Sequence, residues 1–295
     1  MTLRIACAGE AMIELSVRDE TAATLGVAGD TLNTAIYLKR AAPQCEVDYV
    51  TCLGDDPFSD RIRHFIADQD IGTGGITTLP GRSPGLYAIT TSDDGERSFT
   101  YWRGSSAARE MFQYGQEPDF SALEGYDLVY LSGISMAILP HKVRLSLLDW
   151  LVQSDVKFAY DSNYRPRLWE NPATARAVNT MLWARADIGL PSLDDEMALF
   201  DQSAGEVADR FTALSLTGAL KRGADGPLSL GERIDQAYSP AATVVDTTAA
   251  GDSFNGGYLA ALMTGADQAG ALMAGHNCAA RVVQYPGAII PKDAP

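Results

Sequence analysis

An aspartate that follows a run of small residues is the feature of this sequence with the clearest chemical meaning. Residues 244–262 predict the end of a strand, a tight turn and a helix with one apolar side. Ala249, Ala250 and Gly251 form the turn, where small side chains let an anion approach backbone N–H groups at the positive end of the helix. Asp252 follows in the first helical turn. Phosphoryl transfer needs such a pair, because the cradle stabilises the transferred group while the carboxylate accepts the hydroxyl proton.

The same aspartate also has a structural explanation, since acidic residues complement the dipole in the first turn of any helix. Three features favour the catalytic interpretation. The turn holds no bulky side chain, Gly256 and Gly257 predict close packing behind it, and a second acid, Asp246, opens it. We therefore predict that Asp252 is a general base.

The elements that position this segment follow an alternating α/β pattern. Short apolar runs, each closed within two residues by Gly, Asp, Pro or Lys, predict strands at residues 3–8, 128–131, 157–160, 187–190 and 218–220. Stretches with helical spacing lie between them, such as residues 139–154 and 174–186. Apolar strands alternating with helices predict a mostly parallel sheet that is covered on both faces. Ligands then bind at the carboxyl ends of the strands.

One region departs from this alternation. Residues 86–91 and 98–103 predict two strands around the turn signal at residues 92–96. A hairpin between helices predicts a small lid that stands off the main sheet; the alternative is an extra antiparallel edge hairpin. We expect one discontinuous domain over residues 1–295, with a small β lid formed by about residues 12–34 and 81–104.

Composition narrows the class of partner. The 295 residues are 46% hydrophobic and 21% charged, as in globular proteins, and carry a net charge of −15. Such an acidic surface repels phosphate backbones and anionic lipid, so we expect no nucleic-acid and no membrane partner. The sequence has neither a secretory signal nor a long apolar span, and its four cysteines show no paired spacing. We therefore expect a cytoplasmic protein. Because the protein is so acidic, a site for an anionic substrate needs arginines close to it.

The order of the motifs resembles that of the ribokinase-like (PfkB) carbohydrate kinases, and among them the 2-keto-3-deoxygluconate kinase branch. Residues 246–257 resemble the family's C-terminal signature, and seven further blocks follow the branch at residues 9–16, 29–34, 84–87, 95–99, 101–103, 163–169 and 287–291. The resemblance implies a three-layer α/β/α core with a mostly parallel sheet. It also implies Mg²⁺-dependent transfer of the ATP γ-phosphoryl to the terminal 6-hydroxyl of 2-keto-3-deoxygluconate, giving 2-keto-3-deoxy-6-phosphogluconate. A homo-oligomer, dimer or higher, is expected as well, while an effect of K⁺ near Asp246 stays open.

Roles for individual residues follow from the same resemblance. Asp252 is the base, and the anion hole comprises Ala249, Ala250, Gly251 and Asp252, with Arg165 also at the reacting centre. Implied sugar contacts are Gly29, Asp30, Thr31, Leu32, Asn33, Tyr87, Tyr101, Arg103, Arg165 and Asp252. Implied nucleotide contacts are Asn163, Lys221, Arg222, Gly223, Ala224, Asp225, Gly226, Ala249, Ala250, Gly251 and Asn277.

Arg103 and Arg165 distinguish a sugar acid from a neutral sugar, because guanidinium groups bind carboxylates bidentately. Each could instead be an ordinary surface arginine. Two departures from the family pattern stand out. Ala249 replaces a glycine that many relatives have, and the family's Asn-x-x-Glu magnesium motif keeps only Glu196, so we expect Glu196 to act on the metal through water.

Other phosphate-binding schemes are absent from the sequence. It has no GxxxxGK[ST] loop, no His-Arg-Asp or Asp-Phe-Gly triplet and no GxGxxG after a strand. The remaining alternatives are a fructokinase-like or nucleoside kinase of the same family and a catalytically silent sugar-binding regulator. The presence of Asp252 argues against the regulator.

Overall fold

A mostly parallel sheet of eight strands runs through the centre of the computed structural model, which describes residues 2–91, 97–113, 117–292 and 294. In spatial order its strands are β12 (Leu228–Leu230), β11 (Thr217–Leu220), β10 (Ile188–Gly189), β9 (Lys157–Asp161), β8 (Leu128–Ser132), β1 (Arg4–Ala8), β4 (Glu46–Leu53) and β5 (Ile76–Thr78). All neighbouring pairs are parallel except β11–β12. The predicted parallel sheet is confirmed.

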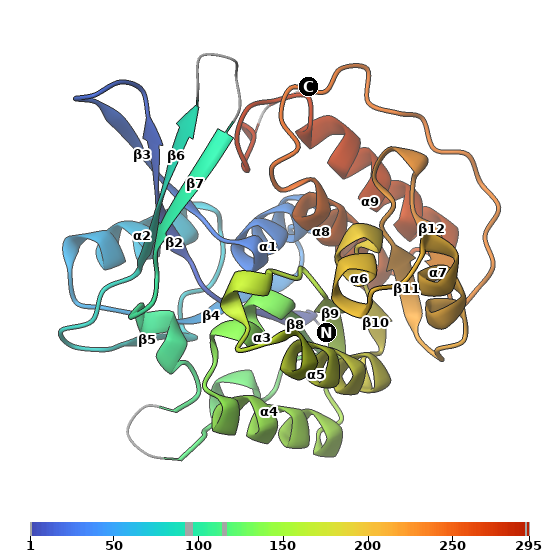
Figure 1. The fold of residues 1–295 in the computed structure, drawn as a ribbon, viewed down its shortest axis with the longest axis horizontal. Coiled ribbons are helices and arrows are strands. Elements are labelled where there is room, and N and C mark those ends of the chain that lie inside the picture. The colour runs from blue at the N-terminus through green and yellow to red at the C-terminus, as the bar shows by residue number, and fades with distance from the viewer. Residues whose placement is uncertain (1, 92–96, 114–116, 293, 295) are drawn as a thin grey trace.

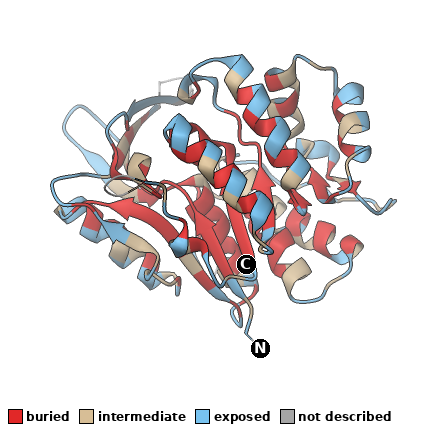
Figure 2. Ribbon diagram, turned by 90° about the horizontal axis from the view of Figure 1, so that it is seen from below, coloured by how far each residue is buried: buried red, intermediate tan, exposed pale blue. Residues whose placement is uncertain are grey.

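Helices cover both faces of this sheet because the side chains of each strand alternate between two apolar clusters. In β1, Ala6 and Ala8 join one cluster, while Ile5 and Cys7 join the other. The first cluster lies under α3 (Gly133–Ile138), α4 (His141–Gln153), α5 (Pro172–Arg185), α6 (Leu193–Phe200) and α7 (Ala204–Thr212). The second lies under α1 (Asp30–Ala41), α2 (Pro57–Asp68), α8 (Ala250–Met263) and α9 (Gln268–Val282). The burial colouring shows the strands enclosed between the two layers (Figure 2).

Four short 3₁₀ turns complete the described elements: η1 (Ala107–Glu110), η2 (Ser121–Leu123), η3 (Pro166–Leu168) and η4 (Gly223–Asp225).

A second, smaller sheet lies at one side of the molecule (Figure 1). Its order is β3 (Ala23–Ala28), β2 (Met12–Val17), β6 (Gly85–Thr91) and β7 (Arg97–Trp102). The antiparallel pairing of β6 with β7 confirms the predicted hairpin strands, and β2 joins β6 in parallel. The turn signal at residues 92–96 lies outside the described residues. Residues 30–34, which the sequence assigned to the lid, form the first turn of α1.

Two adjacent glycines let α8 pack tightly between two neighbouring helices. A Cβ on Gly256 would lie 2.6 Å from Tyr37 Cβ in α1, and one on Gly257 would lie 2.8 Å from Cys278 Cβ in α9. Neither distance leaves room for a side chain. The close packing predicted behind Asp252 is confirmed, and it fixes the N-terminus of α8 against α1.

Candidate active site

The N-terminus of α8 presents backbone amides with no side chain to cap them. Ala249, the N-cap residue, has a left-handed backbone (φ 59°) and makes no capping hydrogen bond. The Ala250 N–H donates to Thr247 O (3.2 Å) and the Ser253 N–H to Ala249 O (2.8 Å), which leaves the amides of Gly251 and Asp252 as donors for an anion. Asp246 holds the preceding loop in place by accepting hydrogen bonds from Thr248 N (3.0 Å) and Gly287 N (2.7 Å).

Asp252 lies in this first turn and contacts α1. Asn33 Nδ2 donates to Asp252 Oδ2 (2.9 Å), and Thr34 Oγ1 donates to the Asp252 carbonyl (3.2 Å). Burial is the main cause that raises the pKa of Asp252 to about 8, and the nearby carboxylate of Asp30 raises this pKa further. The hydrogen bond from Asn33 acts in the opposite direction. A raised pKa suits a general base that works near neutral pH.

Asp30 is tied to the strand ends rather than to its own helix. It makes no capping hydrogen bond in α1, where Gly29 is the N-cap. Instead, Asn163 Nδ2 donates to Asp30 Oδ2 (2.7 Å), while the Asn163 N–H donates to Asp161 Oδ1 (3.2 Å). Asn163 has a positive φ of 28°, which few non-glycine residues adopt. The Asp30 carboxylate therefore does not cap α1 and is held by Asn163, which lies just beyond β9.

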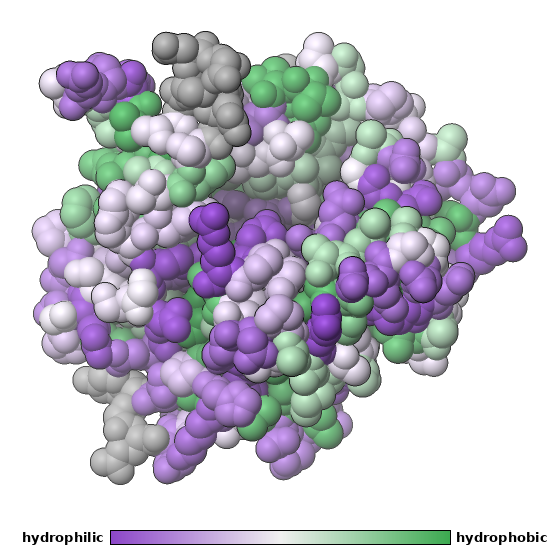
Figure 3. All heavy atoms as spheres, in the orientation of Figure 1, coloured by the Kyte–Doolittle hydropathy of each residue, from purple (hydrophilic) through white to green (hydrophobic). Residues whose placement is uncertain are grey.

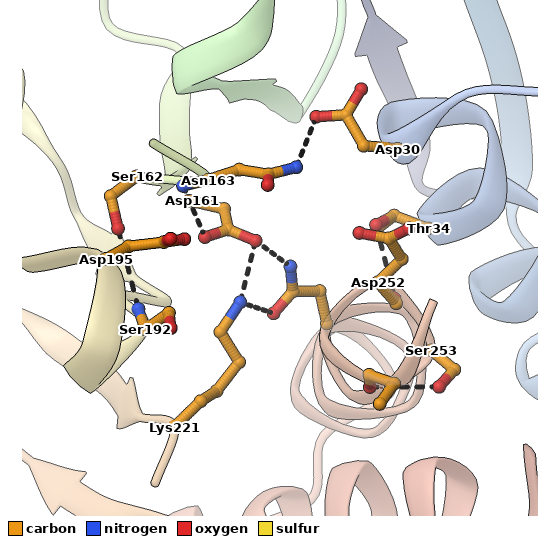
Figure 4. Close-up of polar contacts among 12 residues, drawn as sticks. Asp30, Thr34, Asp161, Ser162, Asn163, Ser192, Asp195, Lys221, Asp252 and Ser253 are labelled. Carbon is orange, nitrogen blue, oxygen red and sulfur yellow. Dashed lines mark hydrogen bonds and ion pairs between the residues drawn. The ribbon is translucent and has the colours of Figure 1, made fainter. Parts of the chain in front are cut away.

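A buried polar network places one ammonium group beside the anion cradle (Figure 4). Lys221 Nζ donates to Asp161 Oδ2 (2.7 Å) and to Asn255 Oδ1 (3.1 Å), while Asn255 Nδ2 donates to Asp161 Oδ2 (2.6 Å). A Cβ on Gly251 would lie 3.5 Å from Lys221 Nζ. Lys221, at the end of β11, thus brings a positive charge to the first turn of α8.

Asp161, Lys221 and Gly251 line one cleft of about 1390 Å³ between the small sheet and the carboxyl ends of the large sheet. The space-filling view shows a hollow in this region (Figure 3). Gly29, Asp30 and Asn33 line it, together with Ala249–Gly251 and Asp252. The C-terminal part of the chain contributes an apolar wall made of Pro227, Pro240, Ala241, Val244, Ala279, Ala280 and Val283. The predicted position at the carboxyl ends of the strands is where the structure places the cleft.

Both predicted arginines line the cleft, and both pair with acidic residues. The buried Arg103 forms an ion pair with Glu10 through Nη2. Arg165 Nη1 donates to Asp195 (3.3 Å), with 52% of its side chain exposed. Burial is the main cause that raises the pKa of Asp195, which lies in the cleft wall. No spacing or motif in the sequence links either arginine to its acidic partner.

The small sheet lines the cleft with aromatic rings. Tyr87 and Tyr101 face each other across β6 and β7, with stacked ring centroids 5.6 Å apart. Phe99 stacks on Tyr101 at 6.4 Å. The Tyr87 hydroxyl contacts Glu14, whereas the Tyr101 side chain is half exposed. Both predicted tyrosines therefore reach the cleft.

Helix geometry turns three predicted site residues away from the cleft, two of them sugar contacts and one a nucleotide contact. Thr31 donates to or accepts from the Tyr49 hydroxyl (2.9 Å), and Leu32 lies in the core, because only the face of α1 with Asp30 and Asn33 meets the cleft. Asn277 is exposed; in α9 the residues that line the cleft are His276, Ala279, Ala280 and Val283. His276 borders the cleft, and its Nε2 contacts Ser239 O (2.7 Å).

The remaining predicted residues divide in the same way. Lys221, Arg222, Gly223 and Ala224 line the cleft, and Asp225 and Gly226 do not. Glu196 is fully buried, outside the cleft lining, and accepts a hydrogen bond from Arg210 Nη2 (2.8 Å). This geometry does not bring Glu196 to a metal site in the cleft. Its neighbours Asp194 and Asp195 face the cleft instead.

Sequence reasoning gave no role to several residues of the site. In the sequence, Asp161 marks only the end of a strand, and Glu10 and Asn255 are only parts of motifs. An acid directly after a buried strand was the signal available for Asp161. The apolar wall carries no motif, because its residues come from separate loops and from one face of α9.

The cleft suits a nucleotide with its metal better than a metal alone. Within the described ranges, no cluster of three acidic, histidine or cysteine side chains could hold a metal ion. Mg²⁺ commonly binds one or two carboxylates together with substrate phosphates, and Asp194 and Asp195 could supply these carboxylates. The apolar wall fits the flat face of a purine.

None of the described helices combines the length and apolarity needed to span a membrane.

Comparison with known proteins gives the family. The pattern of the pfkB family carbohydrate kinases matches residues 2–295. The chain belongs to this family. The 2-dehydro-3-deoxygluconokinase of Escherichia coli (strain K12) is 39% identical to this carbohydrate kinase, covering 100% of this chain and 99% of that protein. The enzyme of the same name from Dickeya dadantii (strain 3937) is 40% identical, with coverage of 99% and 98%.

Solved structures confirm the ribokinase-like fold. The crystal structure of a PfkB protein from Polaromonas sp. JS666 superposes on this carbohydrate kinase with a TM-score of 0.82 at 25% identity. The superposition covers 97% of this chain and 96% of that chain.

Proposed function

We propose that this carbohydrate kinase phosphorylates the terminal 6-hydroxyl of 2-keto-3-deoxygluconate, also named 2-dehydro-3-deoxygluconate, at the expense of ATP. The observation that carries the proposal is Asp252, a carboxylate with a raised pKa in the uncapped first turn of α8, at the wall of a cleft that also holds two arginines. The full-length similarity to two 2-dehydro-3-deoxygluconokinases supports the choice of substrate.

The sugar binds between α1 and the small sheet. Asn33 Oδ1 is buried with no hydrogen-bond partner among the described residues, which is the condition expected of an acceptor that waits for a ligand hydroxyl. Asp30 offers a second acceptor beside it. Arg103 and Arg165 bind the carboxylate of the sugar acid with charge-assisted hydrogen bonds, which a neutral ketose or nucleoside cannot make.

The nucleotide binds on the other side of Asp252. Its phosphates face the first amides of α8 and the ammonium group of Lys221, and its base lies against the apolar wall. Mg²⁺, when bound with the nucleotide near Asp194 and Asp195, supplies positive charge that offsets the charge on the phosphates. The amides and Lys221 add fixed positive charge where negative charge develops.

Asp252 removes the proton during transfer. Its Oδ1 makes no hydrogen bond to any described residue, whereas Asn33 holds Oδ2, so Oδ1 can accept the 6-hydroxyl proton. The hydroxyl oxygen forms a bond to the γ-phosphorus while the bond from this phosphorus to the bridging oxygen breaks. ADP leaves with that oxygen, and the proton stays on Asp252 until solvent removes it.

A substrate panel tests the proposal. ADP release is measured with 2-keto-3-deoxygluconate, fructose, ribose and adenosine under identical conditions. We expect the sugar acid to have a kcat/KM at least about 100-fold above that of any neutral compound, since each charge-assisted hydrogen bond contributes about 1.5–3 kcal/mol. Preference for fructose or adenosine would contradict the roles given to the two arginines.

We further propose that the protein forms a homo-oligomer through the small sheet. Strand β7 lies at the edge of this sheet, and its Phe99 and Trp102 are 41% and 58% exposed. Light scattering at several protein concentrations measures the mass. A Trp102→Ser variant should shift the equilibrium toward monomer, and a monomeric parent protein at every concentration would refute the proposal.

A further inference from the structure

The pair formed by Glu10 and Arg103 is the most enclosed ion pair that borders the cleft. Their side chains are 1% and 9% exposed. Glu10 lies in the short link between β1 of the large sheet and β2 of the small sheet, and Arg103 directly follows β7. The contact therefore joins the end of the small sheet to the segment that leaves the central strand of the large sheet.

Hydrogen bonding within the pair is incomplete. Arg103 Nη2 contacts Glu10 Oε2, while Glu10 Oε1 and Arg103 Nε are buried with no partner among the described residues. The surrounding backbone leaves no spare room, because a Cβ on Gly85 would lie 2.6 Å from Glu10 Oε1 and 3.2 Å from Arg103 Cβ. Gly85 thus provides the space that the carboxylate occupies.

A contribution to folding stability does not by itself explain a buried ion pair such as Glu10–Arg103. Taking both charges out of water often costs as much as their attraction returns, and apolar side chains of similar volume often serve equally well. An arginine whose outer nitrogen must meet a ligand has a different need, since its long side chain otherwise samples many conformers. Arg165 illustrates the contrast, because half of its side chain is exposed and its contact with Asp195 is longer.

We infer that Glu10 is a specificity-determining residue that positions the Arg103 guanidinium to receive the carboxylate of the sugar acid. Arg103 lines the cleft, and its Nη2 contacts Glu10, while its Nη1 makes no hydrogen bond to any other described residue. Glu10 touches neither the transferred phosphoryl nor Asp252, and acts through Arg103. This inference rests on the proposed function, in which Arg103 binds a carboxylate.

The test is a double-mutant cycle read as separate KM and kcat values. Glu10→Ala removes the support, Arg103→Met removes the cation, and the double variant removes both. We expect Glu10→Ala to raise the KM for 2-keto-3-deoxygluconate about tenfold, on the scale of one charge-assisted hydrogen bond, with kcat and the KM for ATP within about twofold of the parent. In the Arg103→Met background, Glu10→Ala should leave the KM for the sugar acid unchanged.

Two further variants distinguish a loss of positioning from a loss of folding. Glu10→Gln keeps the shape and one acceptor oxygen, so we expect a smaller rise in KM from a protein with parental thermal stability. Glu170→Gln serves as the matched control, because Glu170 also pairs with a buried arginine, Arg144, but lies outside the cleft lining. Its KM values should not change.

The possible results separate the inference from the proposed function. An equal effect of Glu10→Ala with and without Arg103 would show a structural role and overturn the inference. An unchanged KM in Glu10→Ala would also overturn it. If Arg103→Met alone left the KM for the sugar acid unchanged, the carboxylate-binding role of Arg103 would fail first and the role of Glu10 with it.

Discussion

Replacing Lys221 by methionine should separate two tasks of one side chain, catalysis and charge compensation. Its ammonium group lies 2.7 Å from Asp161 Oδ2, with 11% and 3% of the two side chains exposed. It also lies beside Gly251 in the anion cradle. Lys221→Met therefore removes a cation from the site of developing negative charge and leaves a buried carboxylate without its partner.

The two effects have different magnitudes. Loss of one fixed donor to a transition-state oxygen costs about 10²–10³ in kcat. Loss of one partner from a buried ion pair costs about 3–5 kcal/mol of the free energy of unfolding. Asn255 continues to donate to Asp161 Oδ2, so we expect the lower end of that range. The double variant Asp161→Asn/Lys221→Met removes both charges and should recover most of the stability but none of the activity.

Urea unfolding and single-turnover phosphoryl transfer, measured on the same three proteins, provide the assay. Titration with ADP adds an independent readout of nucleotide binding, because ADP lacks the transferred phosphoryl but keeps its contacts with the first amides of α8. We expect its Kd to change by less than about tenfold, well below the change in kcat. Parental kcat in Lys221→Met would refute the placement of this cation at the reacting phosphoryl. Recovery of activity in the double variant would refute it as well.

Two other predictions follow from single contacts. The kcat/KM for the sugar acid should rise with pH, because Asp252, with a pKa of about 8, is protonated at pH 5 and loses its proton as the pH passes 8. Asn33→Ala removes a hydrogen bond that lowers this pKa, so the rise should move to higher pH. A flat profile from pH 5 to 9 would contradict both statements. Gly256→Ala should lower the free energy of unfolding by about 1–3 kcal/mol, since the new Cβ would lie 2.6 Å from Tyr37 Cβ, and unchanged urea unfolding would show that α1 and α8 can separate freely.

The strands and the helix that carries Asp252 could be predicted because their signals are local. Buried parallel strands are apolar along their whole length, and the small residues before Asp252 predict an open turn. The same logic located Gly256 and Gly257 as packing positions. These features depend on residue type and spacing, which a single sequence displays.

Contacts between residues far apart in the sequence have no local signal of this kind. Nothing in the spacing links Lys221 with Asp161 or Arg103 with Glu10, since these contacts form only when separate strands bring their ends together. Helix phase explains why two predicted contacts do not line the cleft. Thr31 and Asn277 each follow a residue that lines the cleft, and a step of one residue turns a helical side chain by about 100°.

The role of Asp252 is tested most directly by Asp252→Asn in a quenched-flow measurement of phosphoryl transfer to 2-keto-3-deoxygluconate, together with calorimetric titration of the sugar acid. The amide keeps the shape of the side chain but cannot accept the proton at neutral pH. We expect the transfer rate to fall by about 10²–10⁴ while the Kd of the sugar acid stays within about threefold of the parent value. Transfer at the parental rate would show that another group removes the proton and would contradict the mechanism.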